Sequence, residues 1–413
     1  MIHQPDSFHG LGIAPGLLEA LDKLRFTVPT PIQHKAIPIA IEGKDIIGIA
    51  QTGTGKTLAF GIPMLQRLAQ RNGRGLVLVP TRELAAQVNE TMHKLAPIFK
   101  MKSVLLIGGE SMHAQTLALK HHPRIIIATP GRLNDHIGRH SIRLDDVNIL
   151  VLDEADRMLD MGFAHQIEQI IRTIPRERQT MLFSATMPAS IVKIASAYMH
   201  LPVRTEIAPS GTAPDLVSQE LFVVRKDLKA SLLGELLNQY HGSVLLFVRT
   251  KHSARKVAHG LKALGHNAAE IHANRSQAQR REAMSAFKTG RCRILVATDI
   301  AARGIDVTAI EIVINYDLPD DPENYVHRIG RTGRAGLKGH AISFATPDQG
   351  EDVEKIERII RATIPLSAHP RVPAERFQAG HAPERQQRGQ QRGQQRGQSR
   401  GRQNFGFRGQ RGR

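Results

Sequence analysis

The sequence predicts an α/β protein in which two domains, each a parallel sheet flanked by helices, precede a disordered basic tail. Short apolar runs alternate with amphipathic stretches along most of the 413 residues, which is typical of parallel sheets covered on both faces. A polar segment rich in Pro and Gly, residues 206–216, divides this alternation into two series. After residue 367 the composition changes to Arg, Gln and Gly, which cannot build an apolar core. We therefore expect domains over 1–205 and 217–367, a linker over 206–216 and a tail over 368–413.

Apolar runs bounded by polar turns predict the strands of both domains. In the first domain these runs cover 45–49, 75–79, 103–107, 125–128, 148–152 and 181–183, and an amphipathic pattern over 83–99 predicts a helix. In the second domain they cover 244–248, 268–271, 294–297, 310–314 and 341–344.

The net charge of +18 is shared between the expected core and the tail. Residues 371–413 contain 11 Arg, no Lys and 2 Glu, so they carry 11 − 2 = +9, and the rest of the chain carries the other +9. A basic excess on both parts favours a polyanionic partner such as nucleic acid. The alternative is a soluble basic protein without such a partner, and charge alone does not separate the two.

The single cysteine, Cys292, excludes a disulfide within the chain. An apolar run follows it, so we expect a buried and inert thiol. The first residues show neither the basic nor the apolar region of a signal peptide, and no apolar run approaches the length that spans a membrane. We therefore expect a cytoplasmic protein that does not interact with membranes.

The segment 50–57 matches a phosphate-binding loop in which Ala50 takes the place of the first glycine. Lys56 would reach the β- and γ-phosphates of a nucleotide, and the Thr57 hydroxyl would hold Mg²⁺. The loop residues expected to surround the phosphates are Gln51, Thr52, Gly53, Thr54 and Gly55. A glycine-rich turn with a surface lysine is the alternative, which the predicted strand before the loop and helix after it disfavour.

The run predicted as a strand over 148–152 ends in two acids, Asp153 and Glu154. The carboxyl ends of parallel strands lie at one edge of a sheet, so these acids are expected near the phosphate-binding loop. Asp153 would hold Mg²⁺ through water, and Glu154 would orient and deprotonate the attacking water. The alternative is a pair of solvated turn residues. Because only the first domain contains such a loop, we expect ATP to bind in a cleft between the domains.

These segments, with others in the same order, resemble the motifs of the DEAD-box RNA helicases, and the bacterial RhlE type most closely, over residues 5–366. The resemblance implies two tandem RecA-like domains that bind ATP and Mg²⁺. It also implies that the macromolecular partner is RNA, as single strands or short duplexes bound through the backbone.

The resemblance assigns nucleotide contacts to residues in both domains. Gln33 would hydrogen-bond the edge of adenine and Phe8 would stack on the base; taken alone, Gln33 is as well explained as a polar residue that opens a helix. Asp306 would contact the ribose or the phosphates. The sequence HRIGRTGR over 327–334 places two arginines three residues apart, on one face of a helical turn, where both would reach the γ-phosphate. The expected catalytic residues are then Lys56, Asp153, Glu154, Arg331 and Arg334.

Four further residues are assigned to coupling between the ATP and RNA sites. Ser184 and Thr186 resemble the family's coupling motif, whose hydroxyls bridge the acidic strand end, which includes Asp156, to closure of the RNA site. His327 would link the nucleotide to the RNA. Without its position after the acidic motif, the Ser-Ala-Thr tripeptide would be no more than a turn or cap.

The expected RNA contacts are short, glycine-rich segments and arginines suited to a sugar–phosphate backbone. In the first domain they are Thr81, Arg82, Gly108, Gly109, Thr129, Pro130, Gly131 and Arg132. In the second domain they are Arg249, Gln277, Arg280, Thr298, Asp299, Arg303 and Gly304. The Arg-Gly tail with Phe405 and Phe407 resembles segments that bind RNA by charge and stacking, the alternative being a structurally idle extension.

The resemblance therefore implies ATP-dependent, sequence-independent unwinding of short RNA duplexes and remodelling of ribonucleoproteins. Two other functions share many of these motifs: a DNA-translocating motor, which the acidic and adenine motifs disfavour, and an ATP-gated RNA clamp without turnover. We expect a monomeric core, with ribosomal or RNA-decay complexes as protein partners.

Overall fold

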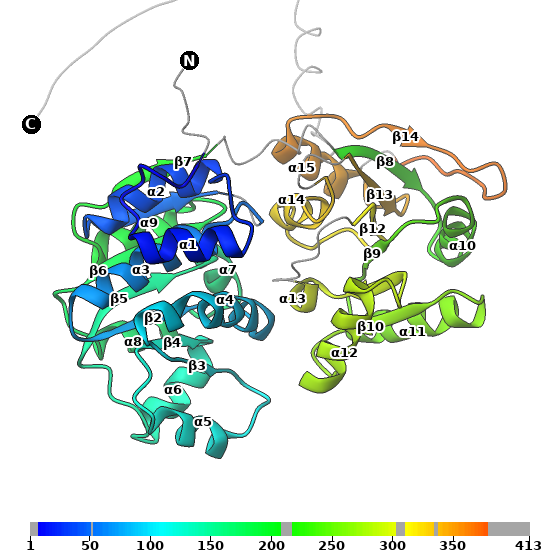
Figure 1. Cartoon of the computed structure of the whole chain (residues 1–413). Coiled ribbons are helices and arrows are strands. Elements are labelled where there is room, and N and C mark those ends of the chain that lie inside the picture. Colours follow the sequence, from blue (N-terminus) through cyan, green and yellow to red (C-terminus); the bar gives the residue numbers. More distant parts are fainter. Residues whose placement is uncertain (1–6, 51–52, 208–216, 303–309, 334–337, 379–413) are drawn as a thin grey trace, which may run out of the picture. The chain divides into compact units, whose positions relative to one another are not determined.

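The computed structural model describes residues 7–50, 53–207, 217–302, 310–333 and 338–378. It contains two seven-stranded sheets with strand orders β3-β4-β2-β5-β6-β1-β7 and β10-β11-β9-β12-β13-β8-β14. All pairings within both sheets are parallel (Figure 1). The predicted α/β class with two parallel sheets is therefore confirmed. No described helix combines the length and the apolar character needed to cross a bilayer.

The first sheet and its helices follow the predicted alternation. The elements are α1 (Pro15–Lys23), α2 (Pro31–Ile41), β1 (Ile46–Ile49), α3 (Lys56–Gln70), β2 (Arg74–Leu78), α4 (Arg82–Leu95), η1 (Ala96–Phe99), β3 (Ser103–Leu106), α5 (Met112–Leu119), β4 (Ile125–Ala128), α6 (Pro130–Gly138), β5 (Val147–Leu152), α7 (Ala155–Asp160), α8 (Ala164–Arg172), β6 (Gln179–Ser184), α9 (Ala189–Tyr198) and β7 (Val203–Glu206).

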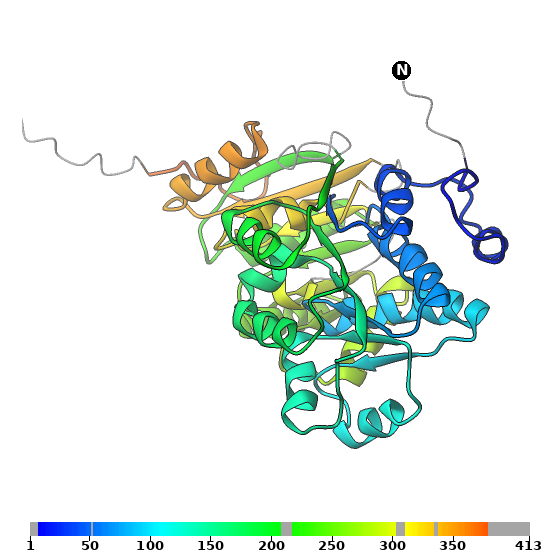
Figure 2. The same cartoon turned by 90° about the vertical axis from the view of Figure 1, so that its left-hand side faces the viewer.

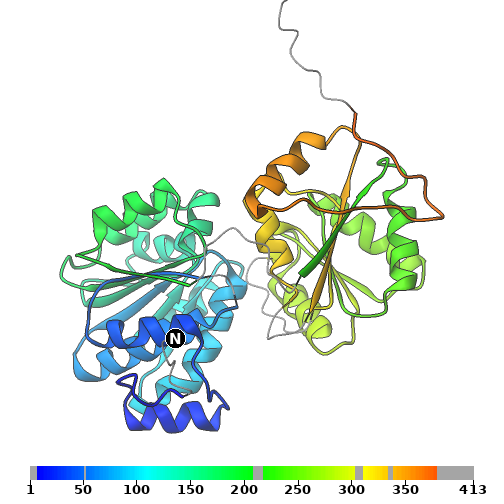
Figure 3. The ribbon, with the colours of Figure 1, turned by 90° about the horizontal axis from the view of Figure 1, so that it is seen from above.

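Alternate side chains of the first sheet enter two different cores, which explains why its strands are apolar throughout. Val77, Val151 and Phe183 pack with α1 to α4 on one face. Leu78 and Leu152 pack with helices α6 to α9 on the other. Figure 3 shows the blue helices on one side of this sheet and the green ones on the other, and Figure 2 shows the same layers from the side.

The second sheet repeats the arrangement with its own helices. The elements are β8 (Val217–Val223), α10 (Lys229–Gln239), β9 (Val244–Phe247), α11 (Lys251–Ala263), β10 (Ala268–Ile271), α12 (Gln277–Lys288), β11 (Ile294–Ala297), α13 (Asp299–Ala302), β12 (Ile312–Asn315), α14 (Glu323–Ile329), β13 (Gly339–Ala345), α15 (Gly350–Ile360) and β14 (Leu366–Ser367). Leu246 packs with α10 and α11 on one face, whereas Leu245 and Ala341 lie in the clusters of the other face.

The end of the first sheet and the start of the tail differ from the sequence prediction. Glu206, expected in the linker, is the last residue of β7 and lies beside Ile49 of β1; residues 208–216 are outside the described part of the chain. The tail was expected to begin at 368, but the compact unit continues to Phe377. Val372 is buried, and Phe377 packs against the cluster of α14 and α15. We did not predict Val372 and Phe377 as part of the fold, because the segment that follows them has the composition of a disordered tail.

Cys292 is buried and forms no disulfide, as predicted. Burial raises the pKa of its thiol, so the reactive thiolate is disfavoured.

Candidate active site

The phosphate-binding loop lies between β1 and α3, at the carboxyl edge of the first sheet. Gly53 and Gly55 have φ values of 87° and 85°, a conformation that glycine adopts at little cost. Lys56 opens α3, and its buried Nζ donates a hydrogen bond of 3.1 Å to the carbonyl of Ala50. The lysine is thus held over the loop, and the start of the helix adds its partial positive charge to the same place.

Gln33 supports this loop from α2. Its Nε2 donates to the Gly55 carbonyl at 3.0 Å, and its Oε1 accepts from the Thr30 N–H at 2.9 Å. Gln33 therefore completes the capping box at the start of α2. This is the helix-opening role that was the alternative to a contact with adenine. Phe8 is 4 % exposed and belongs to the first core, so its contact with adenine stays a prediction.

The two acids follow β5 and are both buried. The Asp153 carboxylate accepts the Glu154 N–H at 2.9 Å. Burial raises the pKa of Asp153 to about 6, and this effect exceeds the opposing attraction of Lys56. Glu154 has a φ of 51°, an unfavourable value for a residue with a side chain, of the kind found at functional sites.

Arg157, which we did not assign from the sequence, stabilises the charge of Glu154. Its Nη1 lies 3.3 Å from the Glu154 Oε2, and both side chains are almost completely buried. Burial alone would raise the pKa of Glu154, but Arg157, Lys56 and Arg331 together lower it. The i,i+3 spacing of Glu154 and Arg157 at the start of α7 was the available sequence signal.

Asp156 and the segment after β6 are joined by hydrogen bonds, as the coupling motif predicted. One Asp156 oxygen accepts the Thr186 hydroxyl at 3.0 Å, the Thr186 N–H at 2.9 Å and the Ala185 N–H at 3.0 Å. The Ser184 hydroxyl accepts the Asp156 N–H at 3.4 Å. A displacement at the acidic strand end would therefore move the segment after β6.

Arg331 lies two residues beyond α14, in a turn in which its N–H donates to the Arg328 carbonyl at 3.1 Å. That Arg331 and Arg334 share one face of a helical turn stays a prediction, because Arg334 lies outside the described residues. Helix α14 ends at Ile329, and Thr332 forms an isolated bridge with Ile310 instead of continuing it. Gly333 has a φ of 66°, which also ends the helical path. Arg331 is nevertheless buried and lowers the pKa of Glu154, so it reaches the acidic site.

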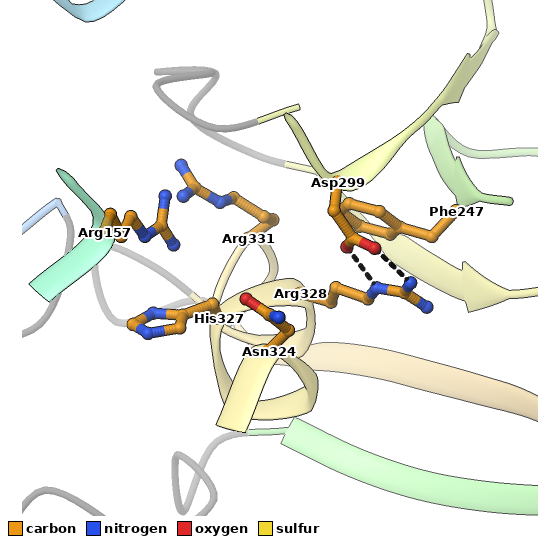
Figure 4. A pocket seen from close by; sticks show the side chains of 7 residues that line it. All are labelled: Arg157, Phe247, Asp299, Asn324, His327, Arg328 and Arg331. Atoms are coloured by element: carbon orange, nitrogen blue, oxygen red, sulfur yellow. Dashed lines mark hydrogen bonds and ion pairs between the residues drawn. The ribbon is translucent and has the colours of Figure 1, made fainter. Parts of the chain in front are cut away.

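His327, Arg331 and Arg157 line one pocket together with Asn324 (Figure 4). Figure 4 shows Arg331 and Arg157 extending toward each other, with the His327 ring beside them. Burial and then Arg157 lower the pKa of His327 well below its usual value. The imidazole is therefore neutral near pH 7, and it can donate or accept a hydrogen bond there without adding charge.

Arg328, to which the sequence assigned no role, anchors the end of α14 within the second domain. Its Nε and Nη2 each donate to one oxygen of Asp299 at 2.6 Å, as the dashed lines in Figure 4 show. Its Nη1 donates to the Asp317 carbonyl at 2.6 Å. Asp299 was expected to contact RNA, but both of its oxygens are used within the second domain. The ion pair with Arg328 does not support an RNA contact from the Asp299 carboxylate. That contact stays a prediction.

Asp299→Ala is expected to destabilise the second domain, because Arg328 would stay buried without its carboxylate. Loss of one partner of a buried pair costs about 3–5 kcal/mol, and the lower end applies here because the Asp299 side chain is 26 % exposed. Thermal unfolding of the full chain tests this. The control is Asp352→Ala, which removes a surface pair and should change stability by about 0.5 kcal/mol or less. Equal unfolding temperatures for the two variants would contradict the anchoring role.

The expected RNA contacts of the first domain gather around a cavity of about 350 Å³. It is lined by Thr81, Arg82, Gly108, Thr129, Gly131 and Arg132 of that domain, and by Arg280 of the second. Burial and then Arg280 lower the pKa of Arg82, which indicates crowded positive charge suited to an anion. Thr81 also accepts the Leu84 N–H and caps α4, while Thr129 and Pro130 begin α6.

Glycine is needed beside Arg82. A side chain at Gly109, whose φ is 79°, would collide with the Arg82 guanidinium, and one at Gly108 would lie 3.0 Å from it. The backbone of the two glycines and the Arg82 guanidinium therefore lie close together. Backbone N–H groups and guanidinium groups both bind phosphate, as expected for a surface that follows a nucleic-acid backbone.

The remaining contacts of the second domain are mostly engaged within the protein. The Arg280 Nε lies 2.7 Å from the Glu83 Oε1, in a buried ion pair between α12 and α4. Arg249 is paired with Asp320 at 3.0 Å. Gln277 begins α12, and its buried Oε1 has no hydrogen-bond partner in the part of the chain that the structure describes. Thr298 follows β11, and its N–H donates to the Ile271 carbonyl.

Six expected site residues lie outside the described part of the chain. These are Gln51, Thr52, Arg303, Gly304, Asp306 and Arg334.

The residues present suit both ATP and Mg²⁺. The Thr57 hydroxyl and the Asp153 carboxylate are hard oxygen donors of the kind that Mg²⁺ prefers. The raised pKa of the buried Asp153 shows that Lys56 alone does not compensate its charge, so a divalent cation would be favourable there. The positive φ values of Gly53 and Gly55 suit a turn that presents backbone N–H groups to phosphate.

Two family models match the chain. The DEAD/DEAH box helicase model matches residues 30–194, which contain the phosphate-binding loop and the acids. The helicase conserved C-terminal domain model matches residues 228–336, which contain His327, Arg328 and Arg331.

Similar proteins share most of their length with this chain. The ATP-dependent rRNA helicase RRP3 of Debaryomyces hansenii is 44% identical over 368 residues, covering 88% of this chain and 77% of the relative. The DEAD-box ATP-dependent RNA helicase CshA of Geobacillus kaustophilus is 44% identical over 356 residues, covering 85% and 76%. The structure of Saccharomyces cerevisiae Dbp5 bound to RNA and ADP BeF3 superimposes with a TM-score of 0.80 at 32% identity, covering 88% of this chain and 95% of that one.

Proposed function

The chain belongs to the DEAD/DEAH box helicase family, and from this premise we propose that it hydrolyses ATP to separate short RNA duplexes locally. The observation that supports this proposal most strongly is the set of basic residues around Glu154. Arg157 and Lys56 of the first domain and Arg331 of the second all lower the pKa of this one carboxylate. Residues from both matched domains thus meet at the position expected for the base.

The charge of Glu154 suits it to orient and deprotonate water. Its lowered pKa keeps it ionised near pH 7, so it can accept a proton in the transition state. Lys56 and Arg331 would compensate the negative charge that develops on the transferred phosphoryl group. Mg²⁺, held by Thr57 and through water by Asp153, would supply charge neutralisation for the phosphates when bound.

RNA binding would affect the ATP site through contacts that the structure already contains. Asp156 and Thr186 join the acidic strand end to the segment after β6, and His327 lies in the pocket of Arg157 and Arg331. RNA bound along the cavity of Arg82, Arg132 and Arg280 would favour one arrangement of the two domains, and ATP would favour the same one. By linkage, each ligand then raises the affinity for the other.

Several finer assignments are part of the proposal and rest on the sequence motifs. They are membership of the RhlE type, a monomeric core, a cytoplasmic location, and ribosomal or RNA-decay complexes as partners. The relatives described above carry the CshA and RRP3 names, so the subgroup rests on the motifs alone.

Steady-state ATP hydrolysis with and without single-stranded RNA tests the proposal. We expect the rate to rise with RNA, and to rise much less with DNA of the same sequence, because contacts to the 2′-hydroxyl favour RNA. Equal stimulation by RNA and DNA would favour the DNA motor. Tight ATP-dependent RNA binding without turnover would favour the clamp.

Deleting residues 381–413 is expected to raise the apparent KM for RNA and to leave the RNA-saturated kcat nearly unchanged. The segment is rich in arginine but contains none of the catalytic motifs. Each phosphate that it neutralises on a single strand should add about 0.7 to the log–log salt slope of affinity. A covalently attached basic segment also raises the effective RNA concentration near the core.

A full-length variant with the arginines of residues 381–413 replaced by glutamine is the matched control. It keeps the length and removes the charge, so it should bind RNA like the deletion. Identical salt slopes for all three proteins would show that the tail is idle.

Asp153→Asn is expected to stabilise the nucleotide-free protein near pH 7 while removing activity. The folded-state pKa of Asp153, about 6, lies above the unfolded value of about 3.9. The charged carboxylate therefore costs stability above pH 6, and this cost vanishes as the pH falls toward 4. At about 1.4 kcal/mol per pKa unit, the neutral variant gains up to roughly 3 kcal/mol. Unfolding temperatures in EDTA from pH 4 to 8 test this, with the exposed Asp135→Asn as control. A gain that grows as the pH falls would contradict the assignment.

A further inference from the structure

A second polar cavity, of about 330 Å³, lies at the opposite edge of the first sheet from the phosphate-binding loop. Gly43 precedes β1, Asn148 lies at the start of β5 and Gln179 begins β6, and all three line the cavity. These three strands are neighbours in the sheet. Because parallel strands have all their amino ends at one edge, the cavity is separate from the ATP site at the carboxyl edge.

Four buried polar atoms of the cavity residues have no hydrogen-bond partner among the described residues. Two are donors, the Nε atoms of Arg67 and Arg178, and two are acceptors, the Asn148 Oδ1 and the Gln179 Oε1. Buried polar atoms without partners are costly and uncommon in folded proteins. These four atoms belong to residues that line one cavity, so a ligand bound there would offer them partners.

The side chains that carry these atoms are held in place by their other groups. The Arg178 Nη1 and Nη2 donate to the Pro175 and Tyr198 carbonyls at 2.7 and 3.1 Å. The Gln179 Nε2 donates to the Ala40 and Lys44 carbonyls, each at 2.8 Å. A ligand would thus meet preformed partners and lose little entropy in ordering them.

Gly43 allows Arg67 to occupy its position. The Arg67 Nη1 donates to the Ile41 carbonyl at 3.2 Å. Gly43 has a φ of +90°, and a side chain there would collide with the Arg67 guanidinium. The backbone of this turn is therefore shaped around the arginine.

The charge of the cavity is suited to an anion. Arg67, Arg71 and Arg178 line it, and the one acid in its lining, Glu177, is exposed and forms no ion pair with them in the described structure. Burial and then Arg71 lower the pKa of Arg67, and burial lowers the pKa of Arg178. No acid raises the pKa of Arg67, and Asp45 raises that of Arg178 by less than burial lowers it, so the positive charge at the cavity is only partly compensated.

We propose that this cavity binds a small phosphorylated ligand that also carries hydroxyl groups. The phosphate would accept from Arg67, Arg71 and Arg178, because guanidinium groups bind phosphate through paired, charge-assisted hydrogen bonds. The hydroxyls would donate to the amide oxygens of Asn148 and Gln179, which inorganic phosphate alone would leave with fewer donors. The volume is at the lower end of small-molecule sites, about 300–1,000 Å³, and suits a sugar phosphate.

The test is calorimetric titration of the full chain with ribose 5-phosphate, in the presence of a saturating non-hydrolysable ATP analogue. The analogue fills the phosphate-binding loop, so the remaining heat reports the second cavity. We expect one binding event for ribose 5-phosphate, weaker binding of inorganic phosphate and none of ribose. Arg71→Gln should weaken binding about tenfold or more, because it removes a charged hydrogen-bond partner.

Arg176→Gln is the matched control, since Arg176 is an exposed arginine of the same loop as Arg178 but does not line the cavity. It should change the affinity by less than about twofold, since only distant, screened charge is lost. The conservative Arg71→Lys keeps the charge of an exposed side chain, so it should weaken binding less than Arg71→Gln and leave the unfolding temperature near that of the parent. Absence of binding at millimolar ribose 5-phosphate, or equal affinities for Arg71→Gln and Arg176→Gln, would overturn the proposal. In that case ordered water satisfies the four atoms.

Discussion

Glu154→Gln is expected to lower the kcat of RNA-stimulated ATP hydrolysis by about 10² or more, while ATP and RNA still bind. The amide has nearly the size of the carboxylate and can still hydrogen-bond, but it cannot accept the proton of the attacking water. The site is arranged to keep this carboxylate charged, since Arg157 lies 3.3 Å away and Lys56 and Arg331 also lower its pKa. Steady-state hydrolysis and equilibrium RNA binding with an ATP analogue measure the two effects separately.

Glu90→Gln on α4 is the control for this substitution. Its side chain is exposed and pairs with Lys94 on the surface, so hydrolysis should stay at the parental rate. A Glu154→Gln protein that hydrolyses ATP like the parent would show that the base has been misassigned. Loss of nucleotide binding along with turnover would instead make Glu154 a ligand of the ground state.

Arg331→Ala is expected to cause a larger loss, about 10³–10⁵ in kcat, with little change in ATP affinity. Arg331 is buried and acts on the charge of Glu154, so in the proposed mechanism its guanidinium would compensate the negative charge that develops in phosphoryl transfer. Arg334→Ala is expected to act in the same way on the sequence motif alone, because Arg334 lies outside the described residues.

Arg358→Ala, on an exposed surface of α15 in the same domain, controls for removal of an arginine and should leave hydrolysis unchanged. The diagnostic result is the division between kcat and KM. A raised KM with an unchanged kcat would mean that Arg331 binds ATP equally in ground and transition states.

The sheets and the phosphate-binding site could be predicted because their sequence signals are local. Strands such as Ile125–Ala128 and Ile294–Ala297 are apolar throughout, since parallel strands are buried on both faces. The loop at Gly53 and Gly55 needs specific residue types within a few positions. Those constraints leave a recognisable pattern in a single sequence.

The supporting contacts could not be predicted because they join residues that are distant in the sequence. Arg328 meets Asp299 across two elements, and Arg280 meets Glu83 across 197 positions. The end of α14 before Arg331 depends on a bridge between Thr332 and Ile310. The polar cavity around Arg67 has no motif, since its members come from the end of α3 and from the amino ends of β1, β5 and β6.

Strand displacement by the full chain tests the central claim most directly. Short and long RNA duplexes with a single-stranded extension would be mixed with the protein and ATP, ADP or no nucleotide, beside Glu154→Gln. Local separation driven by the ATP cycle predicts that short duplexes are separated with ATP, that separation falls steeply with duplex length, and that ADP supports none. Repeated turnover should be lost with Glu154→Gln. Hydrolysis of ATP in the presence of RNA without separation of even the shortest duplex would contradict the account.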